Sequence, residues 1–180
     1  YLFPVDYLLL ASNAEKEAMD AQGVHSRQMI VAGWAFYHGA CSPVLAEDKK
    51  NYRKKLGLNE AKKTIGVTFP TTNSGRESVE VRTRQLDMIS GAFGNRNDLQ
   101  IVIKPHPIEE PLALRKYVDE HLSNAIVLDK EIPIDDMLRA SDVLVNRGAS
   151  QTFMEALLLK VPVVFLNVNV PCVFYESVPN

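Results

Sequence analysis

The chain has 180 residues, of which 46% are hydrophobic and 23% charged, with a formal net charge of −2. Because 20 Lys and Arg face 22 Asp and Glu, no positive excess is left for a nucleic-acid backbone, and no apolar run approaches the ~20 residues that span a bilayer. Cys41 and Cys172 lie far apart without clustered histidines, so we expect no zinc site, no disulfide framework and a reducing, cytoplasmic setting.

Short apolar segments rich in β-branched residues alternate with longer segments of helical periodicity. Expected strands are residues 7–11, 29–32, 64–69, 101–104, 126–128, 143–146 and 163–166. Expected helices are residues 13–21, 47–56, 79–90 and 109–122, a helix opened by Pro133, and an almost entirely apolar, buried helix at 152–159. This alternation predicts an α/β fold, with a parallel sheet buried between helices on both faces.

The alternation is interrupted between residues 34 and 63. We therefore expect three parts: residues 1–45 as the end of an amino-terminal α/β domain, 46–63 as a linker helix, and 64–180 as a second α/β domain truncated at its end. The chain begins with Tyr1, without a signal-peptide pattern, which indicates a piece of a longer protein.

Two charged groups of residues are interpreted as solvent-facing. The basic run from Lys49 to Lys55 predicts a solvated helix face, with contact to a membrane surface as a minor alternative. The carboxylates of Asp135, Asp136 and Asp142 are interpreted as a solvated helix face or a charge bias at a helix start, rather than as a paired acid and base.

Ligands bind open parallel sheets at the carboxyl ends of the strands, so the loops there are the candidate sites. The loop after residue 69 contains Thr72 and Ser74 and could wrap a phosphate with backbone N–H groups, with a plain solvated loop as an equal alternative. The next candidate, Lys104-Pro-His-Pro107, presents His106 rigidly because each proline restricts itself and the residue before it. His106 could donate to a phosphate, or be incidental to a rigid turn.

The loop after residue 145 leads directly into a helix. Gly148 keeps it slim, Arg147 adds a positive charge, and Ser150, Gln151 and Thr152 offer donors at a helix start, where the dipole favours an anion. This arrangement suits a pyrophosphate. Glu155 has two interpretations, because it could close a capping box with Thr152 or accept hydrogen bonds from a ribose diol.

These motifs resemble a known family. The segment from Asp142 to Val164 resembles the nucleotide-sugar-binding signature of GT-B glycosyltransferases, with an Asp-led strand, a small-residue loop, a Glu-bearing helix and a Pro-Val strand. Lys104-Pro-His-Pro107 is similar to the HP element of bacterial GT-B enzymes that build capsule, teichoic acid or sialylated glycans. The resemblance covers roughly residues 6–166 and implies a Rossmann-like GT-B carboxy-terminal half, preceded by the end of the amino-terminal domain.

Carried over by position, the resemblance implies that His106 stabilises the leaving donor phosphate, with Lys104 beside it. It also implies that Ser150, Gln151 and Thr152 bind phosphate and that Glu155 holds the ribose. Such enzymes need no metal or cofactor, because the helix start and basic groups neutralise the leaving nucleotide. The stretch from Arg147 to Ser150 lacks the paired serines of sialyltransferases and glycerophosphotransferases, which argues against a CMP or CDP donor and leaves the base open.

We therefore expect a cytoplasmic fragment of a bacterial glycosyltransferase, with peripheral contact to the inner membrane as a further expectation. It would bind a nucleotide-sugar donor and serve a carbohydrate or lipid-linked acceptor in surface-polysaccharide synthesis. We assign no catalytic base, because the family supplies it from the amino-terminal domain, and we expect poor turnover by the fragment alone. The alternatives are an enzyme like the UDP-sugar 2-epimerases and a catalytically silent Rossmann-like binding or assembly module.

Overall fold

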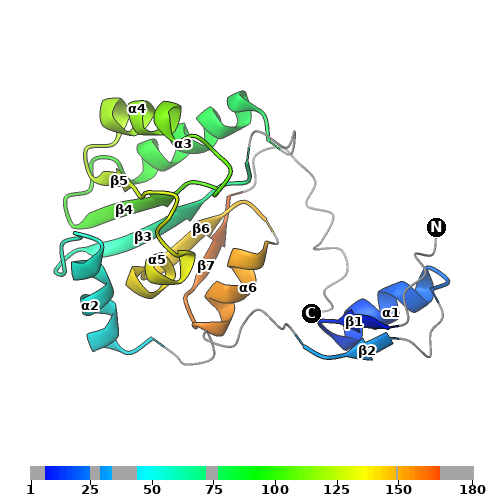
Figure 1. Ribbon diagram of the computed structural model, residues 1–180. Helices are drawn as coiled ribbons and strands as arrows, with labels where there is room; N and C mark the ends of the chain where they lie inside the picture. Colours follow the sequence, from blue (N-terminus) through cyan, green and yellow to red (C-terminus); the bar gives the residue numbers. More distant parts are fainter. Residues whose placement is uncertain (1–6, 25–28, 34–43, 72–76, 149, 167–180) are drawn as a thin grey trace. The chain divides into compact units, whose positions relative to one another are not determined.

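A computed structural model of the chain describes residues 7–24, 29–33, 44–71, 77–148 and 150–166 (Figure 1). Its residues form two compact units, 1–41 and 42–180. The first unit contains β1 (Leu8–Leu10), α1 (Asn13–Ala21) and β2 (Met29–Val31), and the two strands pair in parallel. Thr72, Ser74, Cys41 and Cys172 lie outside the described residues, so the statements about them stay predictions.

The second unit is built on a parallel sheet of five strands in the order β5-β4-β3-β6-β7. Its elements are α2 (Ala46–Lys55), β3 (Lys63–Thr68), α3 (Val79–Phe93), β4 (Leu99–Lys104), α4 (Leu112–His121), β5 (Ala125–Val127), α5 (Ile134–Ala140), β6 (Val143–Asn146), α6 (Gln151–Leu158) and β7 (Val163–Phe165). The predicted α/β fold with a parallel Rossmann-like sheet is therefore confirmed. The strand order reverses between β3 and β6, and this reversal is the place where open sheets bind ligands.

Helices cover both faces of this sheet, with α3 and α4 on one face and α5 and α6 on the other (Figure 1). On the first face, Ile65 and Val67 of β3 share a buried cluster with Leu86 and Ile89 of α3 and Val118 of α4. Residues of a strand alternate between its faces, so Gly66 belongs to the face that α5 covers.

Gly66 allows this close approach. A Cβ at this position would lie 2.6 Å from Ser141 Oγ and 3.3 Å from Met137 Cε, so only glycine lets α5 pack at this distance without a shift. The Ser141 hydroxyl is itself held by a hydrogen bond that it donates to the Met137 carbonyl (2.7 Å).

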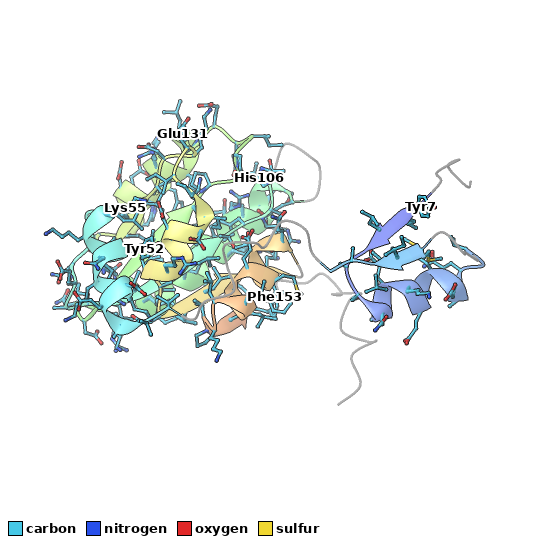
Figure 2. The ribbon with its side chains drawn as sticks, turned by 60° about the horizontal axis from the view of Figure 1, so that its bottom comes forward. Tyr7, Tyr52, Lys55, His106, Glu131 and Phe153 are labelled. Atoms are coloured by element: carbon cyan, nitrogen blue, oxygen red, sulfur yellow. The ribbon has the colours of Figure 1, made fainter. Side chains whose placement is uncertain are left out.

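The basic helix α2 packs against α5 and is not simply a solvated face, which corrects that prediction. Arg53 is only 6% exposed, and Lys55 Nζ pairs with Asp136 at 2.7 Å. Asp136 is buried as well, so it is not a solvated residue, but it lies in the first turn of α5, as the alternative of a charge bias at a helix start predicted. Figure 2 shows Tyr52 on the same helix, with its ring centroid 5.7 Å from the Arg139 guanidinium carbon.

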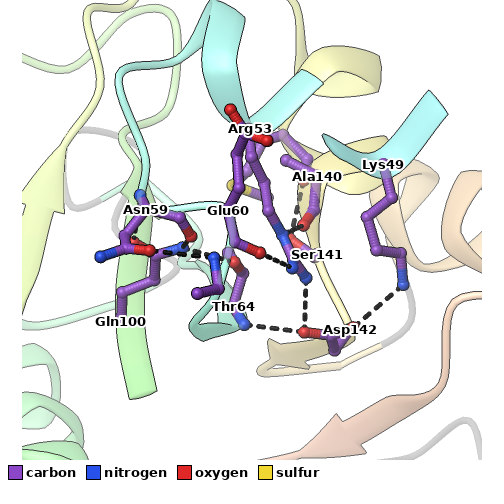
Figure 3. Close-up of polar contacts among 11 residues, drawn as sticks. Lys49, Arg53, Asn59, Glu60, Thr64, Gln100, Ala140, Ser141 and Asp142 are labelled. Atoms are coloured by element: carbon purple, nitrogen blue, oxygen red, sulfur yellow. Dashed lines mark hydrogen bonds and ion pairs between the residues drawn. The ribbon is translucent and has the colours of Figure 1, made fainter. Parts of the chain in front are cut away.

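Asp142 is an anchor at the amino ends of β3 and β6 (Figure 3). Its Oδ2 accepts from the Thr64 backbone N–H (2.8 Å) and from Arg53 Nη2 (2.6 Å), and its Oδ1 accepts from Lys49 Nζ (3.1 Å). Burial alone would raise the pKa of Asp142, but the Thr64, Lys49 and Arg53 donors outweigh it and lower that pKa. Asp142 is therefore a structural anion at the edge opposite the carboxyl ends, and its interpretation as a solvated carboxylate was wrong.

Helix α6 is less buried than its apolar sequence predicts. Within the part of the chain that the structure describes, Ala156 is its only buried residue, while Leu157 is 49% and Leu158 37% exposed. The reason is its place in the sheet, because α6 packs on the short edge strand β7 and on α5, which leaves its opposite side uncovered by described residues.

Candidate functional site

The loop between β6 and α6 is organised by Asn146, which is only 4% exposed. Its Nδ2 donates to the Gly148 carbonyl (2.7 Å) and to Ser150 Oγ (3.1 Å), and its Oδ1 accepts from Thr68 Oγ1 (3.0 Å). Because a carbonyl can only accept, the contact with Gly148 fixes which way the amide points. Gly148 has a φ of +156° and open space around its would-be Cβ, so its conformation, not crowding, favours glycine.

This amide orientation decides what the Ser150 hydroxyl can do. Ser150 Oγ accepts from Asn146 Nδ2 and also from the Phe153 backbone N–H (3.2 Å), as the cap of α6. Two donors fill both lone pairs, so the hydroxyl proton is left to donate outward, and Ser150 is exposed. An exposed hydroxyl that can only donate suits a ligand that can only accept, such as a phosphate oxygen.

Glu155 does not close the capping box considered for it, because the cap of α6 is Ser150 and not Thr152. The carboxylate instead accepts from Gln151 Nε2 of the same helix (3.1 Å). Burial raises the pKa of Glu155. The hydrogen bond from Gln151 opposes this rise, and the charge of Asp135 adds to it. An under-solvated carboxylate of this kind gains from a ligand that brings hydroxyl donors.

Lys104 lies at the end of β4 and is buried. Its Nζ donates to the backbone carbonyls of Asp129 (3.2 Å) and Lys130 (2.8 Å), in the loop after β5. Burial lowers the pKa of Lys104, although Glu131 and Asp129 oppose the effect. The side chain therefore ties two neighbouring loops together.

His106 is half-buried in the turn after β4 (Figure 2). Its Nδ1 accepts a long hydrogen bond from the Ile108 backbone N–H (3.4 Å). When Nδ1 accepts, the neutral ring carries its proton on Nε2, which is then a donor. The Glu109 N–H binds the His106 carbonyl (2.9 Å), and α4 consequently begins at Leu112, three residues later than predicted.

Arg147 is held by a buried network that the sequence analysis missed. Its Nη1 pairs with Glu77 Oε1 at 2.8 Å, Glu77 Oε2 pairs with Arg82 Nε at 2.5 Å, and Arg82 Nη1 lies 3.2 Å from Glu109 Oε1. When the Gln85 amide is oriented to satisfy both neighbours, it donates to Glu77 (3.0 Å) and accepts from Arg147 Nε (3.3 Å). Arg147 lies 70 residues from Glu77 and Arg82 lies 27 residues from Glu109, so only the topology brings these pairs together and no local pattern signals them.

The sheet order places the candidate residues at one edge. The turn with His106 follows β4, and the loop with Arg147, Gly148 and Ser150 follows β6, on either side of β3. Gln151 and Thr152 occupy the first turn of α6. Among the described residues, no three His, Cys, Asp or Glu side chains cluster as a metal site would require. No helix in the described ranges is long and apolar enough to span a membrane.

No known protein-family profile matches the chain, and no curated protein matches it in sequence. Solved structures do match the chain in fold. Wall teichoic acid polymerase TagF matches 89% of this chain and 38% of its own, at 17% identity and a TM-score of 0.58. HepE of Anabaena, solved with UDP-glucose, matches 88% of this chain and 44% of its own, at 15% identity and a TM-score of 0.56.

The chain thus spans less than half the length of each of these two structures. At such identities the likeness shows the fold, an α/β Rossmann-like fold that matches GT-B glycosyltransferase structures.

Proposed function

We propose that the chain is a donor-binding part of a glycosyltransferase, which binds a nucleotide-activated sugar at the carboxyl ends of β3, β4 and β6. The observation that carries this proposal is the Ser150 hydroxyl, which already accepts two hydrogen bonds and must donate outward. It caps α6, whose amino-terminal N–H groups and dipole also favour an anion.

The neighbouring groups complete a nucleotide site of this kind. His106 supplies an Nε2 donor from the adjacent loop, and Glu155 supplies a carboxylate for the ribose hydroxyls. The fold neighbours support this choice of ligand, because HepE was solved with UDP-glucose and a TagF variant was soaked with CDP-glycerol. A surface-polysaccharide acceptor is part of the proposal, by analogy with the wall teichoic acid polymerase.

The chemistry would be displacement at the anomeric carbon of the donor sugar. The bond to the donor phosphate breaks and the leaving nucleotide gains negative charge. Donors that are already in place stabilise this charge without reorganising. In this chain they are Ser150 Oγ, the first N–H groups of α6 and His106 Nε2, while Arg147 has its charge engaged by Glu77.

Calorimetric titration of the chain with UDP, CDP, GDP, ADP and CMP tests the proposal. We expect one nucleotide to saturate, and Ser150→Ala to weaken it by ~10-fold, because a hydrogen bond to a charged group contributes about 1.5–3 kcal/mol. Ser12→Ala is the matched control, because it removes a similar serine cap from α1. It should leave the affinity unchanged.

Two outcomes would contradict the proposal. Absence of binding by all five nucleotides at millimolar concentration would favour a catalytically silent assembly module. Equal losses in Ser150→Ala and Ser12→Ala would show that the weaker binding is not specific to the proposed phosphate donor.

A further inference from the structure

Arg82 of α3 is buried, and each nitrogen of its guanidinium group contacts a different residue. Nε pairs with Glu77 Oε2 (2.5 Å), Nη1 lies 3.2 and 3.3 Å from the two carboxylate oxygens of Glu109, and Nη2 donates to the Pro70 carbonyl. The guanidinium carbon also lies 4.7 Å from the centroid of the Phe69 ring. Its donors are therefore spent inside the protein and not on a ligand.

Each of these contacts leads to a loop of the proposed donor site. Pro70 belongs to the loop after β3. Glu109 belongs to the turn after β4, where its backbone N–H binds the His106 carbonyl at 2.9 Å. Glu77 passes the connection on to Arg147, in the loop after β6 that ends in Ser150.

We propose that Arg82 is a positioning residue that holds together Pro70 and Glu77, the turn after β4 and, through Glu77, the loop after β6, so that phosphate binding depends on a side chain that touches no ligand. This inference rests on the proposed function for its ligand, but the coupling between the loops is a property of the chain alone. The planar guanidinium group of arginine is essential to the role, because a lysine keeps the charge but cannot bind Glu77, Glu109 and Pro70 with three separate nitrogens.

Arg82→Lys is the informative variant, because it retains the positive charge beside Glu77 and Glu109 and so limits the damage to the fold. Arg84→Lys is its matched control, since Arg84 is exposed on the same helix. Circular dichroism and thermal unfolding establish that both variants are folded before any comparison is made.

Amide hydrogen exchange by NMR then reports on the loops without any nucleotide. Two backbone N–H groups report on the loops: that of Glu109, which binds the His106 carbonyl, and that of Phe153, which binds Ser150 Oγ. The reference is the Thr64 N–H at the opposite edge of the sheet, which binds Asp142. In Arg82→Lys we expect the two reporters to exchange ~10-fold faster and the reference to change less than about twofold, because local openings differ in free energy. Arg84→Lys should change none of them.

Nucleotide affinity supplies the second readout. Whichever of UDP, CDP, GDP, ADP or CMP binds the unmodified chain should bind Arg82→Lys ~10-fold more weakly, about 1.4 kcal/mol, and Arg84→Lys equally well. Unchanged exchange at Glu109 and Phe153, equal acceleration at all three amides, or faster loop exchange with unchanged affinity would each overturn the positioning role. If the unmodified chain binds no nucleotide, the proposed function fails, while the exchange rates still decide whether Arg82 couples the loops.

Discussion

Thr68 Oγ1 donates to Asn146 Oδ1 over 3.0 Å and so joins the carboxyl ends of β3 and β6, the two strands between which the sheet order reverses. On the other side of the same amide, Nδ2 donates its two hydrogens to the Gly148 carbonyl (2.7 Å) and to Ser150 Oγ (3.1 Å). Hydrogen bonds therefore run in one direction, from the buried Thr68 hydroxyl through Asn146 to Ser150, whose own proton points to the outside. The direction of these hydrogen bonds favours a ligand that accepts a hydrogen bond at Ser150.

Reversing that direction should weaken phosphate binding. An Asn146→Asp side chain has no donor, so it would turn the Ser150 proton inward and place a carboxylate beside the Gly148 carbonyl. We expect the nucleotide affinity to fall by ~10- to 100-fold, since a charged hydrogen bond is lost and a like charge is added near the phosphate. Calorimetry on the folded variant measures this.

Thr68→Val is the matched control for Asn146→Asp, because it changes the same series of hydrogen bonds at its other end. It removes the donor to Oδ1 but leaves the contact with the Gly148 carbonyl, which by itself keeps the amide orientation. The affinity should therefore fall by no more than about threefold. Equal losses in Asn146→Asp and Thr68→Val would show that the direction of the hydrogen bonds is irrelevant.

His106→Ala should weaken the binding of ligands that carry phosphate and leave the binding of the corresponding nucleoside unchanged. Its Nε2 donor would contact the diphosphate and not the base, so we expect a nucleoside diphosphate to bind ~10-fold more weakly and the corresponding nucleoside to bind unchanged. His121→Ala, an exposed histidine at the end of α4, is the control. A similar loss for the nucleoside would place His106 at the base or reduce it to a role in the turn.

Asp142→Asn should destabilise the chain in a pH-dependent way. The pKa of Asp142 is lowered in the folded chain from its ordinary value of 3.8. Its ionised form therefore adds stability above that value, and the addition is lost as the pH falls through the folded pKa. Denaturant unfolding at pH 7 should show a loss of about 1–3 kcal/mol, and at pH 3 the difference from the unmodified chain should be smaller.

Asp98→Asn is the matched control for that measurement. The pKa of Asp98 is also lowered, first by its hydrogen bond from Arg96, but both side chains are more than half exposed, and exposed pairs contribute little. It should cause no measurable loss of stability at either pH. A pH-independent loss in Asp142→Asn would show that its hydrogen bonds stabilise the chain equally well without the charge.

The sequence predicted the fold well because strand periodicity and β-branched runs are local signals, and β6 was predicted at its exact bounds. It also predicted which loops would meet, since parallel strands bring their carboxyl ends to one edge. It could not predict that Arg147 pairs with Glu77 or that Arg82 pairs with Glu109, because these partners are 70 and 27 residues apart. The cap is Ser150 and not Thr152 because α6 begins at Gln151, one residue earlier than the sequence predicted.

Glu155→Gln should stabilise the chain while weakening its ligand. Burial raises the pKa of Glu155 above its ordinary 4.5, so the ionised side chain lowers the folded stability at pH 7, and this cost disappears as the pH falls below that value. The melting temperature of Glu155→Gln should therefore be higher at pH 7 and equal at pH 4. Glu120→Gln, at an exposed position on α4, should change neither the melting temperature nor the nucleotide affinity.

The ribose role of Glu155 is tested with a modified ligand. The unmodified chain should bind the 2′-deoxy form of its nucleotide ~10-fold more weakly than the ribonucleotide, whereas Glu155→Gln should discriminate much less between them. If both proteins distinguished the ribonucleotide from its 2′-deoxy form equally well, Glu155 would not contact the ribose. The stability prediction would be unaffected.

Gly66→Ala should destabilise the second unit through one steric contact that a second substitution can relieve. The added methyl group would lie 2.6 Å from Ser141 Oγ and 3.3 Å from Met137 Cε, and overpacking of this kind costs about 1–3 kcal/mol. Ser141→Ala removes the nearer atom, together with its hydrogen bond to Met137. In a double-mutant cycle by denaturant unfolding, the two losses should be less than additive by about 1 kcal/mol. Additive losses would mean that the strain at Gly66 comes from the backbone of β3 and not from the approach of α5.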